Sequence, residues 1–366
     1  MTKGIEMKLN ATRYIVGFTL AAAVGGAGAR AEDAGGGTAK ASRDWGKHPA
    51  IVQLDTTEDV FAVGDAHGDP GRLAAVLAAA KLTRTAAVAP DQVKWAGGKA
   101  VLVVTGDMID KWTDSLGVIA LLRALQRDAT TQGGQVIITM GNHEGEFLAD
   151  PLGKKTAEFA AELKAAGLDP GEVGRCAGDL GQFLCELPIG VRVNDWFFSH
   201  GGNTGGQTIA QLGAAIQSGF AESGFATPAL VGDNSILEAR LNKKGPNGLP
   251  WFQVGKASTD PKALLLRYAH QLGVKHMVQG HQYGRVKFPD GKDRDEETLF
   301  QRYGLLFLID SGMSQGIEDS DSTGGALRIA GTADRQQAIV ICANGTQKVL
   351  WESGKDQGHK EQHCGK

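Results

Sequence analysis

The sequence has little cysteine, no block of basic residues, no acidic tail and no apolar run long enough to cross a bilayer. Four cysteines occur in 366 residues and no two have a Cys-x-x-Cys spacing, which excludes a cysteine-based metal site. A net charge of -3 without basic clusters excludes a nucleic-acid surface and indicates an ordinary soluble protein. With 42% hydrophobic residues, the chain is able to bury the core of one large domain or of two small ones.

The longest apolar segment lies near the start of the sequence, at residues 14–29. At about 16 residues, it is shorter than the roughly 20 that span a bilayer. Lys8 and Arg13 precede it, and residues 29–31 (Ala-Arg-Ala) supply the small residues that a signal peptidase needs. We therefore predict that residues 1–31 are a cleaved secretory signal, with an uncleaved membrane anchor as the alternative.

Cleavage would leave a secreted protein without stable membrane insertion, in the periplasm if the source is bacterial. Translation starts at Met1 or at Met7, since the first six residues add nothing to a signal. We expect residues 32–50, which begin with a glycine- and alanine-rich stretch, to be a flexible linker. One domain is expected over residues 51–355, followed by a C-terminal tail over residues 356–366.

All four cysteines lie in the predicted mature chain. An even number permits disulfides in an oxidising compartment, and four cysteines allow three pairings. The pairing of Cys176 with Cys185 and of Cys342 with Cys364 closes the shortest loops. Independent buried thiols are the alternative.

The first half of the predicted domain alternates apolar strands with amphipathic helices. Strands are predicted at residues 59–63, 100–105 and 135–140, and helices at residues 70–80 and 115–127. This alternation favours an α/β fold with a mainly parallel sheet covered on both faces. Ligands of such sheets bind beyond the carboxyl ends of the strands. Asp69 is predicted to cap the first of these helices, which starts at Pro70.

The second half is less regular and richer in strands. We expect the strands after residue 303 to form a second sheet packed on the first. The predicted elements are a hairpin over 190–199, helices over 154–166, 209–216, 235–241 and 261–272, and strands over 275–278, 305–309, 326–329, 337–341 and 348–351.

Polar side chains follow five of the apolar strands. Taken singly, each has an ordinary explanation as a helix cap, a turn residue or a loop histidine. Five such loops in succession instead provide the nitrogen and oxygen ligands that a pair of divalent metals needs. The residues are Asp65 and His67, Asp107 and Asp110, Asn142 and His143, His200, and His281.

The order of these motifs resembles the calcineurin-like metallophosphoesterase superfamily, whose signature runs Gly-Asp-x-His, Gly-Asp-x-x-Asp, Gly-Asn-His-Glu, His and Gly-His. The resemblance covers about residues 58–312 and implies a four-layer α/β/β/α sandwich of two mixed sheets flanked by helices. Residues 64–69, 142–144 and 199–202 are most similar to the phosphoprotein-phosphatase branch. Residues 309–314 (Ile-Asp-Ser-Gly-Met-Ser) resemble a late motif of the Shewanella-like protein phosphatases.

The resemblance also implies a role for each loop residue. His143 would protonate the leaving alkoxide, and Asp110 would orient His143 and keep it protonated. The metals are two divalent or trivalent ions, and the ligand types suit Mn, Fe or Zn nearly equally. The implied ligands are Asp65 and His67 for the first metal, Asp107 as the bridge, and Asn142, His200 and His281 for the second.

Two positions depart from the family pattern. Lys111-Trp112 replaces the usual Arg-Gly, and lysine lacks the bidentate fork with which arginine grips phosphate. Tyr283 replaces the second histidine of the Gly-His-x-His found in small phosphodiesterases. Lys111 and Arg240 are the candidates for binding phosphate, and a solvated helix arginine is the alternative for Arg240.

The sequence therefore predicts a metal-dependent phosphomonoesterase that acts through a hydroxide bridging the two metals. Its partner would be a peptide carrying phosphoserine, phosphothreonine or phosphotyrosine, or a small phosphoester. The alternatives are a dinucleoside-polyphosphate hydrolase, which shares two of the motifs, and a metal-binding scaffold with an inactive site. All five loops are intact and His143 and Asp110 are retained, which favours an enzyme.

Overall fold

A computed structural model describes residues 43–242, 260–332, 334–355 and 358–365. The predicted signal peptide and the first part of the expected linker lie outside these residues. In the described part of the chain, no helix is long and apolar enough to cross a membrane.

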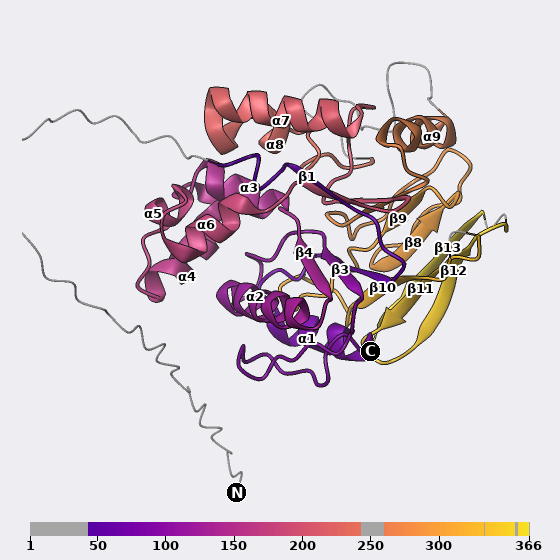
Figure 1. The fold of residues 1–366 in the computed structure, drawn as a ribbon, viewed down its shortest axis with the longest axis horizontal. Helices are drawn as coiled ribbons and strands as arrows, with labels where there is room; N and C mark the ends of the chain where they lie inside the picture. Colours follow the sequence, from indigo (N-terminus) through magenta and orange to yellow (C-terminus); the bar gives the residue numbers. More distant parts are fainter. Residues whose placement is uncertain (1–42, 243–259, 333, 356–357, 366) are drawn as a thin grey trace, which may run out of the picture. The chain divides into compact units, whose positions relative to one another are not determined.

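Two mixed β-sheets face each other, and helices cover their outer sides (Figure 1). The first sheet has the strand order β12-β11-β10-β2-β3-β4, and the second has the order β1-β5-β6-β7-β9-β8-β13. The strands are β1 (Ile51–Leu54), β2 (Val60–Val63), β3 (Val101–Val104), β4 (Gln135–Ile138), β5 (Gly190–Val193), β6 (Trp196–Ser199), β7 (His276–Gln279), β8 (Thr298–Arg302), β9 (Leu306–Leu308), β10 (Gly325–Ala330), β11 (Gln337–Cys342), β12 (Gln347–Glu352) and β13 (His359–His363).

The helices lie on the outer sides of the sheets, so the expected four-layer α/β/β/α arrangement is confirmed. The helix α1 is capped by Asp69, whose carboxylate accepts a hydrogen bond from the Arg72 amide at 3.0 Å, as predicted. The helices are α1 (Pro70–Ala79), α2 (Ser115–Thr131), α3 (Asn142–Ala149), α4 (Ala157–Ala165), α5 (Pro170–Gly174), α6 (Gly178–Glu186), α7 (Ile209–Ser223), α8 (Pro228–Val231) and α9 (Pro261–Leu272), with short 3-10 turns at Lys154–Thr156 and Gly224–Ala226.

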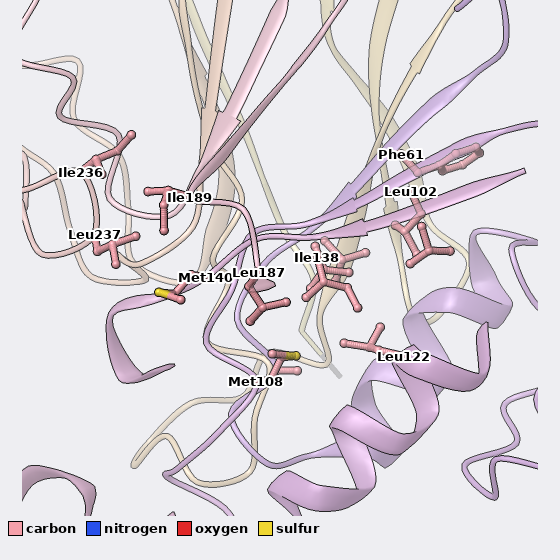
Figure 2. Packing of buried hydrophobic residues seen from close by; sticks show 14 of the residues in the cluster. Phe61, Leu102, Met108, Leu122, Ile138, Met140, Leu187, Ile189, Ile236 and Leu237 are labelled. Atoms are coloured by element: carbon pink, nitrogen blue, oxygen red, sulfur yellow. The ribbon is translucent and has the colours of Figure 1, made fainter. Parts of the chain in front are cut away.

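The central strands β2 and β3 of the first sheet are buried on both faces. On β3, Val101 and Val103 belong to the core between the two sheets, whereas Leu102 and Val104 belong to the core shared with the helices. Strands with two buried faces need continuous apolar runs rather than alternation, which explains Val-Leu-Val-Val at this position. Figure 2 shows the core on the helix side, with Leu102, Leu122 and Met108 among the residues that form it.

The allocation of the late strands differs from the prediction. Strands after residue 303 do not form a sheet of their own, because β10, β11 and β12 extend the first sheet, with β10 antiparallel to β2. The strand β9 instead pairs with β7 and β8 in the second sheet. Both sheets are therefore mixed rather than mainly parallel. The free edge of β2 is filled by a strand far along the sequence, and local patterns carry no information about that pairing.

One predicted helix is also absent. Residues 235–241 form turns rather than a helix. The Ser235 hydroxyl accepts hydrogen bonds from the amides of Leu237 and Glu238, at 3.3 and 3.1 Å. A serine side chain that bonds to nearby backbone groups offers the chain an alternative to helical hydrogen bonding.

Both ends of the domain extend beyond their expected bounds. Residues 43–50 were expected to belong to the flexible linker, but the Arg43 guanidinium donates to the carbonyls of Cys185 and Leu187 at 2.8 and 2.7 Å. The expected C-terminal tail contains β13, which pairs with β8.

Both predicted disulfides are present. Cys176 is bonded to Cys185, and Cys342 is bonded to Cys364. The described part of the chain contains no free cysteine, so the alternative of independent buried thiols is wrong.

Candidate metal centre

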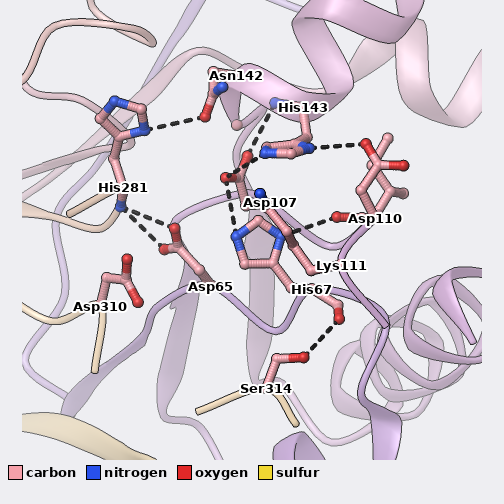
Figure 3. Close-up of polar contacts among 12 residues, drawn as sticks. Asp65, His67, Asp107, Asp110, Lys111, Asn142, His143, His281, Asp310 and Ser314 are labelled. Atoms are coloured by element: carbon pink, nitrogen blue, oxygen red, sulfur yellow. Dashed lines mark hydrogen bonds and ion pairs between the residues drawn. The ribbon is translucent and has the colours of Figure 1, made fainter. Parts of the chain in front are cut away.

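The predicted metal ligands and His143 follow the carboxyl ends of parallel strands from both sheets (Figure 3). In the first sheet, β2, β3 and β4 lead to Asp65 and His67, to Asp107, and to Asn142 and His143 respectively. In the second sheet, β6 leads to His200 and β7 to His281. Because the corresponding ends of both sheets meet at one edge of the sandwich, residues up to 216 positions apart come into contact there.

Asp107 lies at the centre of this group. Its Oδ2 is 3.5 Å from His67 Nε2, 3.3 Å from His200 Nε2 and 4.0 Å from His143 Nε2. A Cβ atom at Gly141 would lie 2.1 Å from Asp107 Oδ1, so only glycine allows the Asn142 loop to approach this closely.

Three histidines have their tautomers fixed by backbone carbonyls. His67 Nδ1 is 3.0 Å from Ile109 O, His200 Nδ1 is 2.8 Å from Thr105 O, and His281 Nε2 is 3.0 Å from Glu238 O. A carbonyl only accepts hydrogen bonds, so each of these ring nitrogens carries the proton. The other nitrogen of each neutral ring therefore points a lone pair into the site.

The side-chain oxygen of Asn142 lies close to two of these ring nitrogens. Its Oδ1 is 2.9 Å from His200 Nε2 and 3.0 Å from His281 Nδ1, and these two nitrogens are 3.0 Å apart. Three unprotonated donor atoms at such distances repel each other unless a cation or a proton lies among them. This arrangement is typical of a metal site whose ligands are oriented by carbonyls in the surrounding protein.

Asp65 faces the same space from β2. Its two carboxylate oxygens accept hydrogen bonds from the His281 amide at 3.1 and 3.0 Å. Burial and the neighbouring carboxylates of Asp310 and Asp107 raise the pKa of Asp65 well above its usual range. Bound cations would remove this repulsion, because they offset the charges of the carboxylates.

The buried charges also shift the pKa values of the histidines. Burial and the proximity of His200 and Arg240 lower the pKa of His281 well below its usual range. At His200 burial acts in the same direction, but the carboxylate of Asp107 outweighs it and raises the pKa. His281 therefore stays neutral, and its Nδ1 keeps the lone pair that faces the site. The charge of Asp107, which raises the pKa of His200, is one that a bound cation would offset.

His143 and Asp110 form a pair beside this group. His143 Nδ1 is 2.8 Å from Asp110 Oδ2, and the other oxygen of Asp110 accepts a hydrogen bond from the Phe159 amide at 3.0 Å. Burial would lower the pKa of His143, but the carboxylates of Asp107 and Asp110 outweigh this and raise it to about 9. His143 is therefore protonated at neutral pH, with Nε2–H on the side of Asp107.

The two predicted phosphate-binding residues lie at the edge of the site. Lys111 is exposed and has a left-handed backbone with φ 70°, and its charge contributes, after burial, to lowering the pKa of His67 to about 4. Arg240 Nη1 donates a hydrogen bond to the His281 carbonyl at 2.8 Å. Arg240 is therefore tied to the site loop, and the alternative of a solvated helix arginine is wrong.

Three further residues support the site but were not among the predicted site residues. Glu144 accepts hydrogen bonds from the amides of Asp107 and Met108 at 2.9 and 2.8 Å, so it holds the central loop. Asp310, in the late motif, lies close enough to Asp65 to raise its pKa. Arg294 is fully buried. The sequence could not predict this burial, because Arg294 lies in a run of charged residues.

Arg294 connects loops that carry the site residues. Among the residues that the structure describes, its guanidinium donates hydrogen bonds to backbone carbonyls alone, including those of Gln282, Gly284 and Asp310. The carbonyls of Gln282 and Asp310 come from the loops that follow β7 and β9. A single buried side chain thus fixes the position of the His281 loop relative to Asp310.

Two mixed sheets with this constellation at one edge define a class of metal-dependent phosphoesterases. A family profile described as calcineurin-like phosphoesterase matches residues 59–284. The chain belongs to this family.

The chain is also similar to several known proteins. An uncharacterized protein of Schizosaccharomyces pombe is 38% identical over 73% of this chain and 74% of its own length. Shewanella-like protein phosphatase 1 of Plasmodium berghei is 30% identical over 39% of this chain and 38% of its own length. The structure of a cold-active protein-tyrosine phosphatase from a psychrophilic Shewanella species matches with a TM-score of 0.59 and 19% identity, over 82% of this chain and 84% of that chain. The last similarity shows the fold alone.

Proposed function

We propose that the chain is a dinuclear metal-dependent phosphomonoesterase acting on phosphoserine, phosphothreonine or phosphotyrosine in peptides, or on small phosphoesters. The observation that carries this proposal is the set of inward lone pairs around Asp107. His67 Nε2 and His200 Nε2 lie 3.5 and 3.3 Å from Asp107 Oδ2, and backbone carbonyls hold both rings in the tautomer that a metal requires.

The donor set fits two ions with one shared ligand. Asp65, His67 and Asp107 would hold the first ion, and Asp107, Asn142, His200 and His281 the second. Imidazole, amide and carboxylate donors suit Mn, Fe or Zn. When bound, two such ions would activate a water molecule and neutralise charge on the phosphate oxygens.

His143 would donate a proton to the oxygen that leaves phosphorus. Its Nδ1–H is held by Asp110 at 2.8 Å, and the second proton of the imidazolium lies on Nε2, which faces the site. A pKa of about 9 keeps that proton in place at neutral pH. Such positioned proton donors contribute typically about 10²- to 10⁴-fold to rate. The retention of this pair argues against an inactive scaffold.

Lys111 and Arg240 would bind the phosphate group by charge. Both raise the positive potential at the site, since Lys111 contributes to lowering the pKa of His67 and Arg240 contributes to lowering that of His281. Lysine at position 111 provides a point charge rather than a planar fork. The names of two similar proteins, a protein phosphatase and a protein-tyrosine phosphatase, support phosphorylated peptides as substrates.

The decisive experiment compares phosphopeptides with a dinucleoside tetraphosphate, using purified protein of measured metal content. Release of phosphate from a phosphopeptide is expected, with at least about two metal ions per chain by elemental analysis. Activity on the dinucleoside tetraphosphate alone would contradict the proposal. An Asp107→Asn variant should lose metal, because it removes the shared charge, whereas an exposed Asp319→Asn control should keep it.

A further inference from the structure

A second group of metal-ligating side chains lies outside the centre described above. It consists of Glu297, Asp321 and His363, whose ligand atoms all lie within 4.8 Å of one another. His363 Nε2 is 3.0 Å from Asp321 Oδ1 and 3.7 Å from Glu297 Oε2. We call this group the C-terminal triad.

The triad is assembled from three segments that are fixed independently of its side chains. His363 ends β13 and precedes Cys364, which is bonded to Cys342. The Thr323 amide and hydroxyl both donate to the Cys364 carbonyl, at 2.7 and 2.9 Å, which holds the Asp321 segment against β13.

Glu297 is held in the same way. Its amide donates to the Tyr283 carbonyl at 2.7 Å, and its side chain is only 14% exposed. The carboxylate is therefore positioned beside His363 by the backbone and by its surroundings, and little rotamer freedom remains for it to lose on binding an ion.

The ligand types and distances suit a divalent cation. Two carboxylates and one imidazole supply the oxygen and nitrogen ligands that an ion of the zinc type takes. An N–H at His363 Nε2 would donate a hydrogen bond to Asp321 but is too far from Glu297 to donate one there. Ligand atoms about 3.4 Å apart are what a tetrahedral ion with bonds of about 2.1 Å requires.

We propose that the C-terminal triad binds a divalent cation of the zinc type, with neutral His363 and the two carboxylates as ligands and water completing the coordination. This site is separate from the catalytic centre. Open coordination positions and the exposure of Asp321, 68% at its side chain, make it an exchangeable site rather than a closed structural one.

The bound ion would stabilise loops that lead to the catalytic centre. Ser320, next to Asp321, donates to the Gly312 carbonyl at 2.8 Å, and the Gly312 amide donates to Asp310 at 3.0 Å. Glu297 is hydrogen-bonded to Tyr283, two residues after His281. The ion would thus connect the loops after β7 and β9 to the disulfide-bonded C-terminal strand.

The test uses the full chain and zinc ions alone, with diethylpyrocarbonate as a histidine-modifying probe and peptide mapping to read each histidine. His363 has 41% of its side chain exposed and should react in metal-free protein. At a free zinc concentration about ten times the dissociation constant, about nine tenths of the sites are filled. Modification of His363 should therefore slow about tenfold. The exposed His270 should react equally with and without zinc.

Two matched variants test whether the protection of His363 by zinc depends on the triad. Asp321→Asn removes a charged ligand at an exposed position and should abolish the protection of His363. Asp319→Asn, also exposed and two residues away, should keep it. Circular dichroism of both variants checks that the fold is retained. Equal modification of His363 with and without zinc in the wild type, or full protection in Asp321→Asn, would overturn the proposal.

Discussion

At the scale of single residues, the chemistry of the site depends on where protons are held. The carbonyls that accept from His67, His200 and His281 leave one lone pair of each ring directed inward. Asp110 also accepts from Nδ1 of His143, but its negative charge and that of Asp107 keep this ring protonated on both nitrogens, so Nε2 is a donor. In the proposed mechanism, histidine therefore serves as a metal ligand beside a carbonyl and as an acid beside a carboxylate.

Replacing His143 should separate metal binding from proton transfer. His143→Ala is expected to keep its metal content and to lose about 10²- to 10⁴-fold in turnover of a phosphoserine peptide. The loss should be much smaller for p-nitrophenyl phosphate, since its leaving group needs no proton. Kinetics on both substrates, with elemental analysis, test this. Equal losses on both substrates would remove the assignment as an acid, and His270→Ala, at an exposed position, is the control.

His276 affects the stability of the fold rather than the chemistry of the site. It lies on the strand β7 and not in the loop that follows it. Its ring stacks on Trp196 with centroids 4.0 Å apart, and burial lowers its pKa to about 4. Below about pH 6.5 the unfolded chain binds a proton that the folded state excludes. Stability from the neutral ring is therefore complete above pH 6.5 and is lost as the pH falls toward 4.

His276→Phe should flatten this pH dependence. Between pH 6.5 and pH 4 the wild type is expected to lose about 3 kcal/mol of unfolding free energy through His276, and the variant should not. Urea unfolding at several pH values measures the difference in slope. A His270→Gln control should follow the wild type, and parallel curves for His276→Phe and the wild type would contradict the prediction.

At the scale of elements, the loops after β7 and β9 depend on a buried cross-link. Arg294 is 0% exposed, and its guanidinium serves carbonyls on both loops, so His281 and Asp310 are placed relative to each other by one side chain. Lysine carries the same charge but cannot span these carbonyls, because it lacks the planar fork.

Arg294→Lys is therefore expected to weaken both the fold and the metal centre. Unsatisfied buried carbonyls should cost about 1–3 kcal/mol of unfolding free energy, and displacement of the His281 loop should weaken metal binding by about 10- to 100-fold. Thermal unfolding and titration with a chelator measure the two effects. Arg285→Lys, at an exposed arginine, is the control, and a metal affinity like that of the wild type would contradict the positioning role.

At the scale of the whole molecule, two disulfides fix the periphery of the domain. One of them, Cys342–Cys364, joins β11 in the first sheet to the residue after β13 in the second. We propose that both bonds form after export, since disulfides persist in oxidising compartments. The predicted signal at residues 1–31 is consistent with this, and N-terminal sequencing of the secreted protein tests it.

Removing the Cys342–Cys364 bond should destabilise the chain. A Cys342→Ser/Cys364→Ser variant is expected to lose about 3 kcal/mol of unfolding free energy, because the bond restricts the unfolded chain. Amide exchange should increase mainly in β13, which pairs only with β8 among the described strands. Urea unfolding with and without reductant measures the loss. A variant as stable as the oxidised wild type would contradict the prediction.

The sequence by itself predicted the strands of the first sheet, the positions of the candidate metal ligands after strand ends and the cap at Asp69, and it favoured the disulfide pairing that the structure contains. These features depend on neighbours in the chain, on hydrophobic periodicity and on loop length. The sequence did not predict the turns at residues 235–241, where a serine hydroxyl competes with helical hydrogen bonds.

Only the tertiary structure decided which sheet each late strand joins, that residues 359–363 form β13, and that Arg294 and Asp310 support the site. The partners in these contacts lie far apart in the sequence, and their pairing depends on which edges and carbonyls remain free once the sheets have formed. The candidate metal centre shows both contributions. Local sequence places each candidate ligand at a strand end, and the meeting of two sheets brings His281 to Asp65 and directs side-chain nitrogens toward Asp107.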